Sequence, residues 1–346
     1  MQGVEGSVAL VSGGAGFVGS NLVRQLLAAG ARRVHVIDNL LSAERVNLAD
    51  HPALQFTEGS IADDGILQPL KDEYDYVFHL ATYHGNQSSI HDPLADHANN
   101  TLTTLKLYER IKAFRALKKV VYSSAGCSVA EKTFDAAKAT EETDIVALTQ
   151  DSPYSMSKVF GEFYSVYYHK QHGLPAVRAR FQNVYGPGEI LGAGKWRGTP
   201  ATVWRNVTPT FIYKALMKES LPLENDGVAT RDFIYVEDVA RGLIACALRG
   251  RPGQAYNIAN GRETSILDLA TRINALTGNP APFLKLPKRA WDNSGKRFGS
   301  TAKSRAELGF EAGTGIDEGL KLTVEWTTRN LPLIRKTIAK HDAHMR

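Results

Sequence analysis

The sequence has few of the residues on which several classes of protein depend. Only two of its 346 residues are cysteines, Cys127 and Cys246, too few for a disulfide framework or a cysteine-based metal cluster. The ten histidines include no HExxH motif, and no apolar run approaches the ~20 residues of a membrane span. The N-terminus has no basic segment ahead of its first apolar run. We therefore expect a cytoplasmic protein with no metal, no signal peptide and no membrane partner.

The chain also lacks a block of like charge. Its 41 basic and 36 acidic residues are scattered, and they leave a net charge of only +5. Proteins that bind nucleic acid usually gather their basic residues on one face. We therefore expect no nucleic-acid partner, and the small positive excess fits an anionic small ligand better.

What the sequence does contain is an alternation of short β-branched runs with helical patterns. Strands are predicted at 8–12, 33–38, 76–81, 119–124 and 176–186, and helices near 17–29, 94–114 and 154–172. Strand and helix in alternation are typical of a parallel sheet with helices on both faces. The sequence therefore predicts an α/β protein with a Rossmann-type, doubly wound parallel sheet.

The composition changes after about residue 187, where glycine, proline, tryptophan and basic residues replace the alternating pattern. We interpret this segment as a ligand-facing loop of a smaller α/β substrate-binding domain. A strand and then a helix are predicted again over 231–248, and a helix runs from the capping box at Ser265 to Gly278. The expected division is a Rossmann domain at 1–182 with 232–262, a second domain at 183–231 and 263–330, and a C-terminal helix or solvated tail at 331–346 that includes His341 and His344.

The segment VSGGAGFVGS places Gly13, Gly16 and Gly19 between a predicted strand and a predicted helix. Such a loop lets the backbone approach a pyrophosphate, whose negative charge the helix N-terminus favours. The next strand ends at Asp38, about 20 residues on, where a carboxylate can bind ribose hydroxyls. A 2′-phosphate about 4 Å from it would be disfavoured by roughly 4 kcal/mol, and no arginine follows directly. The sequence therefore predicts NAD as the cofactor of the first domain.

A tyrosine and a lysine are spaced for proton transfer. In DSPYSMSK, Ser152 can cap a helix that Pro153 opens, so Tyr154 and Lys158 fall on one helix face. A free tyrosine has a pKa near ~10, and a neighbouring ammonium favours its ionised form. The alternative is a structural tyrosine beside a surface lysine.

The chain resembles the extended short-chain dehydrogenase/reductases. The resemblance rests on the order and spacing of the glycine loop, Asp38, the serines that end the strand at 119–124, and the YxxxK motif. Within that family the chain is similar, over nearly its full length, to NAD-dependent nucleotide-sugar epimerases and dehydratases. The segments that match UDP-galactose 4-epimerase are HLATYHGNQSSIHDP, NNTLTTLKL, FQNVYGPGE, NVTPTF, ATRDFIYVEDVARG, YNIANG and PKRAWDNSG. The resemblance extends to epimerases of bacterial lipopolysaccharide O-antigen pathways and implies a homodimer.

The resemblance also implies roles for single residues. Ser124, with Ser123 as its rival, would bind the sugar 4-hydroxyl, while Tyr154 is the base and Lys158 its partner. Around the cofactor it places Gly13, Gly16, Phe17, Val18, Gly19, Asp38, Asn39, Leu40, Ser60, Ile61, Leu80, Ala81, Thr82, Asn100, Tyr154, Lys158 and Tyr185. Around the nucleotide sugar it places His84, Ser89, Asn183, Asn206, Val207, Leu223, Arg231, Arg289 and Asp292.

The residues after the strand at 119–124 bear on the reaction. Dehydratases that the chain resembles carry Thr-Asp-Glu there and sugar-acid decarboxylases Thr-Ser-Glu, whereas this chain has Gly126-Cys127-Ser128, without a carboxylate. The resemblance therefore favours epimerisation at C4 through a 4-keto intermediate. A 3- or 5-epimerase that uses Cys127 as acid and base stays open, although a small thiol can also simply pack behind Ser124. A 4,6-dehydratase and a catalytically idle NAD-sensing protein are the remaining alternatives.

The sugar itself stays open between a UDP-hexose and a UDP-uronic acid. Lys195, Arg197 and Arg205 leave room for the carboxylate of a uronic acid. Synthesis of a surface polysaccharide is the role that the resemblance implies.

Overall fold

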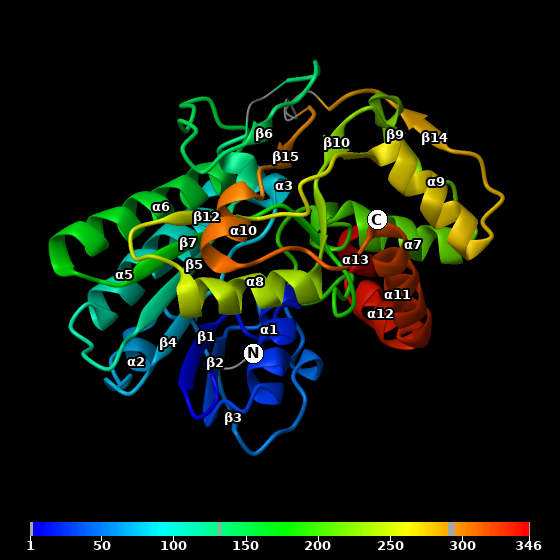
Figure 1. Cartoon of the computed structure of the whole chain (residues 1–346). Coiled ribbons are helices and arrows are strands. Elements are labelled where there is room, and N and C mark those ends of the chain that lie inside the picture. Colours follow the sequence, from blue (N-terminus) through cyan, green and yellow to red (C-terminus); the bar gives the residue numbers. More distant parts are fainter. Residues whose placement is uncertain (1–2, 131–132, 290–294, 346) are drawn as a thin grey trace.

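The computed structural model describes residues 3–130, 133–289 and 295–345, and a seven-stranded parallel sheet lies at its centre (Figure 1). The strand order is β12-β7-β5-β4-β1-β2-β3. The strands are β1 (Val8–Ser12), β2 (Arg33–Asp38), β3 (Leu54–Glu58), β4 (Tyr76–His79), β5 (Lys119–Ala125), β7 (Ala176–Phe181) and β12 (Ala255–Ile258). All five residues of β1 are buried, as a parallel strand covered on both faces requires.

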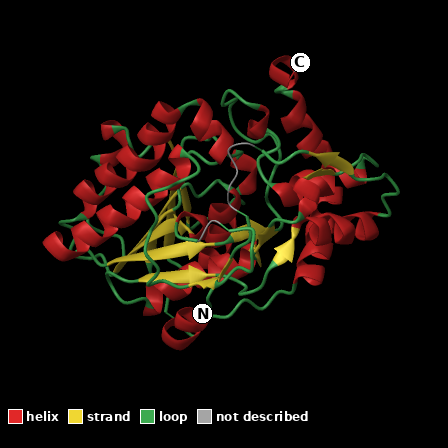
Figure 2. Cartoon of the chain, turned by 90° about the horizontal axis from the view of Figure 1, so that it is seen from above, coloured by secondary structure: helices red, strands yellow, loops and turns green. Residues whose placement is uncertain are grey.

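Helices cover both faces of the sheet (Figure 2). On one face, α1 (Phe17–Ala28) and α8 (Val236–Arg249) bury Leu22, Leu26 and Leu243 in a shared core. On the other, α5 (Leu102–Ile111) and α6 (Pro153–His172) bury Leu107 and Tyr168. The predicted doubly wound Rossmann-type fold is therefore confirmed.

A third core lies beside the sheet, towards the C-terminal helices at the right of Figure 1. It is built from α7 (Val207–Leu216), α9 (Ile266–Thr277) and α11 (Ile316–Arg329), together with the parallel pair β8 (Asn183–Tyr185) and β11 (Phe233–Tyr235). Phe211 and Phe233 of this core also line the main cavity of the molecule. The division of the chain into two domains stays a prediction.

The remaining elements are short or lie at the periphery. They are α2 (Asp64–Leu67), α3 (Asn86–His91), α4 (Pro93–Asp96), β6 (Ala139–Thr140), β9 (Pro222–Glu224), β10 (Thr230–Arg231), β13 (Thr264–Ser265), β14 (Leu284–Leu286), β15 (Phe298–Gly299), α10 (Ala302–Leu308), α12 (Leu331–Ala339) and α13 (Asp342–Met345). Among the described residues, no helix is long and apolar enough to cross a bilayer.

Two expected elements are divided in the structure. The strand expected at 176–186 ends at Phe181 and resumes as β8, which pairs with β11 and not with the central sheet. The helix expected at 94–114 contains a π-helical turn at His97–Thr101. In this turn Asn100 accepts a hydrogen bond from the backbone N–H of Tyr83 at 2.6 Å and donates to Asp96 at 2.7 Å. The turn therefore joins the helix to the end of β4.

The C-terminal segment is packed, although the sequence suggested a solvated tail. His341 is buried and bonds through Nε2 to the carbonyl oxygen of Gly192 at 2.9 Å. Thr337 on α12 donates to the carbonyl oxygen of Leu191 at 2.7 Å. The last helices therefore hold the segment that follows β8.

Candidate active site

A cavity of about 750 Å³ opens where the parallel strands reach their carboxyl ends, the usual place for a ligand in such a sheet. The predicted site residues that line it are Gly13, Gly16, Phe17, Val18, Gly19, Asp38, Asn39, Ser60, Ile61, Leu80, Ala81, Thr82, His84, Ser123, Ser124, Tyr154, Lys158, Asn183, Asn206, Val207, Arg231 and Arg289. The fold therefore brings together segments that are more than 200 residues apart in the sequence.

The glycine loop forms the cofactor end of the cavity. Gly13 has φ +77°, and a Cβ there would lie 2.5 Å from the backbone nitrogen of Ala81. Asp38 at the end of β2 accepts hydrogen bonds from the backbone N–H groups of Ala15 at 3.0 Å and Leu40 at 2.9 Å. Burial raises the pKa of Asp38, and these N–H groups oppose that shift. The loop thus offers a bare backbone cradle beside a carboxylate, which fits the pyrophosphate and ribose of NAD.

Tyr154 and Lys158 project from the first turns of α6. Ser152 caps the helix by accepting from the backbone N–H of Ser155 at 3.2 Å, and Pro153 occupies the first turn. The Lys158 ammonium lies 5.8 Å from the centroid of the Tyr154 ring. It also donates to the carbonyl oxygen of Ser123 at 3.0 Å, which ties α6 to the end of β5.

The ring of His84 also contacts Tyr154. The His84 and Tyr154 rings pack edge to face, with centroids 5.8 Å apart and an interplanar angle of 68°. Burial, together with the positive charges of Arg205, Arg197 and Lys158, lowers the pKa of His84 to about 3. The imidazole is therefore neutral at physiological pH.

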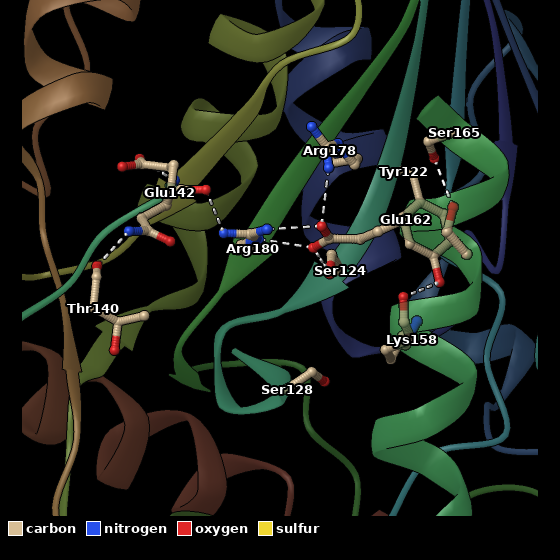
Figure 3. A network of polar contacts seen from close by, with 12 residues as sticks. Tyr122, Ser124, Ser128, Thr140, Glu142, Lys158, Glu162, Ser165, Arg178 and Arg180 are labelled. Carbon is tan, nitrogen blue, oxygen red and sulfur yellow. Dashed lines mark hydrogen bonds and ion pairs between the residues drawn. The ribbon is translucent and has the colours of Figure 1, made fainter. Parts of the chain in front are cut away.

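Ser124 belongs to a buried charged network (Figure 3). Its hydroxyl donates to the carboxylate of Glu162 on α6 at 2.5 Å. Two guanidinium nitrogens of Arg180 donate to the same carboxylate at 2.8 Å each, and Arg178 donates at 3.1 Å. Burial alone would raise the pKa of Glu162. The hydrogen bonds and positive charges of Arg180 and Arg178 outweigh burial, so the pKa of Glu162 is lowered. Glu162 is therefore an anion that fixes the end of β5.

At the end of the cavity away from the glycine loop, cationic side chains lie close to the short strands β9 and β10. Arg231 donates to the carbonyl oxygens of Thr230 at 2.7 Å and Gly295 at 2.6 Å, and Arg289 forms an ion pair with Glu224 at 2.5 Å. The other cationic residues that line this end are Lys214, Lys288 and Arg297. The arrangement suits a diphosphate, because a guanidinium matches phosphate oxygens bidentately.

Some predicted residues support the cavity from behind. Ser89 is fully buried, donates to the carbonyl oxygen of Asn86 at 2.8 Å and accepts from the backbone N–H of Tyr154 at 3.1 Å. Asn100 braces the segment after β4 through Tyr83. Leu40 lies beside the lining residues and donates its backbone N–H to Asp38.

Two further predicted residues lie in the third core. Tyr185 packs edge to face against Tyr235 and Phe233, and Leu223 is buried in the same cluster. Neither lines the cavity. Asp292 lies outside the described residues, and so does the side chain of Cys127.

Two carboxylates in or next to the cavity, Glu162 and Glu189, were not proposed as site residues from the sequence, whereas Arg205 was named only as room for a uronic acid carboxylate. Glu162 was missed, although it follows Lys158 by four residues on the same helix face, a spacing that could have indicated it. Glu189 and Arg205 lie in the irregular segment after β8 and reach the cavity only through tertiary contacts. No group of three or more His, Cys, Asp or Glu in the described part of the chain is arranged to hold a metal ion.

Comparison with known proteins agrees with this arrangement. Residues 9–259 match the NAD dependent epimerase/dehydratase family. UDP-glucose 4-epimerase from Mycolicibacterium smegmatis is 31% identical over 92% of this chain and 97% of its own. A dTDP-glucose 4,6-dehydratase from Streptomyces antibioticus is 29% identical over 93% of this chain and 92% of its own. The chain spans only about half, 47%, of the trifunctional Arabidopsis thaliana enzymes that it also matches.

Among solved structures, the Bordetella bronchiseptica enzyme WbmF in complex with NAD+ is 67% identical, covers 99% of this chain and 98% of its own, and superposes with a TM-score of 0.89. The same enzyme has been solved with NAD+ and UDP, at a TM-score of 0.90. The glycine loop, Asp38 and these relationships confirm NAD as the cofactor. The chain is therefore an enzyme that belongs to the NAD-dependent epimerase/dehydratase family.

Proposed function

We propose that this enzyme inverts C4 of a UDP-activated sugar, for surface polysaccharide synthesis in the cytoplasm. The observation that carries the proposal is that Tyr154 and Lys158 share one cavity with the glycine loop, Asp38 and a cationic far end. The relatives named UDP-glucose 4-epimerase and the WbmF complex with UDP support a uridine nucleotide. A UDP-hexose and a UDP-uronic acid are both candidates for the sugar.

In this mechanism Tyr154 moves the proton and its neighbours hold it in place. NAD supplies the hydride acceptor and donor at C4 when it is bound. The Tyr154 oxygen takes the proton of the sugar 4-hydroxyl as the ketone forms. It returns the proton after the keto sugar has rotated in the site to present its other face. The Lys158 ammonium, 5.8 Å from the ring centroid, stabilises negative charge on that oxygen. The Ser89 hydroxyl accepts a hydrogen bond from the backbone N–H of Tyr154 and so fixes the position of that residue.

Of the two serines, we assign the sugar 4-hydroxyl to Ser123. Ser124 donates to the buried Glu162 carboxylate, so its hydroxyl proton is already engaged. The Ser123 hydroxyl lines the cavity, 3.5 Å from the Lys158 ammonium. The family resemblance favoured Ser124, and the contact of Ser124 with Glu162 is the reason for preferring its neighbour.

The resemblance suggests the other ligand contacts, and the position of these residues in the cavity lining supports them. Arg231 and Arg289 bind the diphosphate of the nucleotide, with Asn206 and Val207 beside it. Asn183, at the start of β8, faces the sugar.

We also propose a homodimer formed through α6. Its exposed apolar side chains are Met156, Phe160, Phe163 and Tyr167, which recur at helical spacing on one face. Phe160 and Phe163 pack edge to face, with centroids 6.3 Å apart. An apolar stripe of this kind on an outer helix is typical of an interface.

The direct test is incubation with UDP-glucose, UDP-glucuronate and their N-acetylated forms in heavy water. A C4 epimerase should give the C4 epimer without carbon-bound deuterium, because the hydride does not exchange with solvent. A dehydratase would release a 4-keto-6-deoxy sugar. Deuterium at C3 or C5, lost in a Cys127→Ala variant, would instead show a 3- or 5-epimerase and contradict the proposal.

A further inference from the structure

Asp96 is a buried carboxylic acid that the proposed mechanism does not use. It ends α4, is only 1% exposed and is not among the residues that line the cavity. Its carboxylate accepts a hydrogen bond from the side-chain amide of Asn100 at 2.7 Å, and another hydrogen bond connects it to the hydroxyl of Ser157 on α6. Burial of a carboxylate costs free energy, so it is kept inside a protein only where donors surround it.

The carboxylate determines which way the Asn100 amide faces. An ionised carboxylate only accepts hydrogen bonds, so the amide nitrogen of Asn100 turns towards Asp96 and the amide oxygen turns away from it. That oxygen accepts from the backbone N–H of Tyr83 at 2.6 Å and from the hydroxyl of Thr82 at 2.9 Å. Asp96 therefore holds, through Asn100, the segment that follows β4.

This segment is part of the cofactor end of the cavity. Ala81 and Thr82 line the cavity, and Ala81 lies against the glycine loop. The contact is so close that a Cβ on Gly13 would be 2.5 Å from the backbone nitrogen of Ala81. A displacement of the segment would therefore disturb the loop that faces the cofactor.

The charge of Asp96 depends on pH. Burial raises the pKa of Asp96 to about 6, although the hydrogen bonds of Ser157 and Asn100 and the positive charges of Lys158 and His97 oppose that shift. The carboxyl is therefore ionised at neutral pH and protonated at moderately acidic pH. A protonated carboxyl carries a donor of its own, so it no longer matches the amide nitrogen of Asn100 on both of its oxygens.

Other titratable groups lie on the elements that pack around the carboxylate. Asp92 opens α4, α3 carries His91, and α6 carries Tyr154. In the segment after β4 lies Tyr83, whose pKa burial raises, and the Arg197 guanidinium lies 5.7 Å from the centroid of its ring. A comparison of variants, and not a change of pH alone, therefore isolates the contribution of the carboxylate.

We propose that the carboxylate of Asp96 is a positioning residue for NAD, which orients the Asn100 amide and so holds the segment after β4 against the glycine loop. This role goes beyond the proposed function, because it concerns the cofactor and not the sugar. Loss of the charge, by substitution or by protonation, should release the segment and weaken NAD binding. It should do so without removing any side chain that lines the cavity.

The test compares the full-length wild type with Asp96→Asn, which has the same shape and no charge, and with Asp232→Asn as the matched control. Asp232 is equally buried, and burial raises its pKa to about 6 as well. It accepts from the backbone N–H groups of three residues that do not line the cavity, Asn260, Gly261 and Gly299. The dissociation constant of NAD is measured by calorimetry from mildly alkaline to moderately acidic pH.

At mildly alkaline pH, Asp96→Asn should bind NAD about tenfold to 100-fold more weakly than the wild type. The ratio of the two dissociation constants should shrink as pH falls through about 6 and approach one at acid pH, where the wild-type carboxyl is protonated too. The other titrating groups are present in both proteins, so their effects cancel in the ratio. Asp232→Asn should keep the wild-type affinity at every pH. A ratio that does not change with pH, equal affinities throughout, or the same pattern in the control would overturn the proposal.

Ser157→Ala keeps the proposal testable if Asp96→Asn does not fold. The Ser157 hydroxyl lowers the pKa of Asp96, so its removal should make NAD affinity fall at a higher pH than in the wild type. An unchanged pH dependence of NAD affinity would overturn the proposal. Because these are measurements with NAD alone, they stand even if the wild-type enzyme epimerises no sugar, a result that would sink only the proposed function.

Discussion

Ser123 and Ser124 are adjacent on β5, yet they meet different partners. Both residues line the cavity, but the Ser124 hydroxyl is bonded to the buried Glu162 carboxylate, whereas the Ser123 hydroxyl lies 3.5 Å from the Lys158 ammonium. Ser124→Ala should therefore lower the free energy of unfolding by about 1.5–3 kcal/mol, the usual loss for a bond to a charged group. Ser123→Ala should leave stability nearly unchanged and reduce turnover. Urea denaturation and steady-state kinetics on both variants test this, and the reverse pattern would restore Ser124 as the sugar-binding residue.

Tyr154→Phe removes the ionisable oxygen and keeps the ring that packs on His84. We expect turnover to fall by at least the ~10² typical of general acid–base groups. The melting temperature should hardly change, because the ring contacts remain. A variant with near wild-type turnover would make Tyr154 structural and the mechanism wrong.

His79 gives stability a pH dependence of known sign. It is buried between Ser12 at 2.8 Å and Thr104 at 2.9 Å, and burial lowers its pKa from 6.5 to about 3. Between these values the unfolded chain binds more protons than the folded one. The free energy of unfolding should therefore fall as pH falls, by up to about 1.4 kcal/mol per pH unit.

His79→Gln cannot titrate, so this contribution should vanish. Urea denaturation at several pH values from neutral to moderately acidic should show a shallower fall for His79→Gln than for the wild type. His51→Gln, at an exposed histidine, should keep the wild-type slope. Equal slopes for all three proteins would contradict the assignment.

Among the elements, burial decides which ones the sequence could predict. β1 and β2 were predicted at their observed limits because most of their residues are apolar or β-branched, and all of them except Arg33 are buried. β3 was missed, since its residues are half-buried or exposed and its pattern LQFTE is weak. The break between β7 and β8 depends on pairing with β11, more than 40 residues away in the sequence, so local pattern could not show it.

The same distinction separates the site residues. The glycine loop, Asp38, Tyr154 and Lys158 have fixed local spacings, so the sequence alone could indicate them, and the structure brings them to one cavity. Arg205 lies in a segment without periodicity and meets Ser42 only through the tertiary fold. Most residues transferred by resemblance alone also line the cavity; the described ones that do not are Leu40, Ser89, Asn100, Tyr185 and Leu223.

Contact between α6 and β5 leaves no room for a larger residue at Gly161. A Cβ there would collide with the hydroxyl of Tyr122 on β5. Gly→Ala in a helix usually stabilises by about 0.4–1 kcal/mol, but Gly161→Ala should destabilise by about 1–3 kcal/mol through overpacking. Gly65→Ala on α2, where the added Cβ would lie 3.3 Å from a carboxylate oxygen of Asp63 and near no other atom, is the control. Thermal and urea denaturation measure the stability of both variants and of the wild type. A Gly161→Ala variant as stable as the wild type would contradict the packing argument.

At the scale of the whole molecule, the apolar stripe on α6 predicts the oligomeric state. The wild-type protein should sediment as a dimer, and Phe160→Asp with Phe163→Asp should sediment as a monomer that retains NAD. Leu284→Asp changes an exposed apolar residue on β14, outside α6, and this variant should remain dimeric. Analytical ultracentrifugation decides, and a monomeric wild-type protein at micromolar concentration would exclude the interface.

The packed C-terminal segment has a consequence for biosynthesis. His341 and Thr337 hold the segment that follows β8, and Lys340 pairs with Glu44 in the loop after Asp38. The ribosome releases the glycine loop early and these residues long afterwards. The nascent chain can therefore form the glycine loop well before the C-terminal helices can bind the segment after β8. Stable enclosure of NAD should accordingly be among the last events of maturation, and it should be sensitive to fusions placed after residue 345.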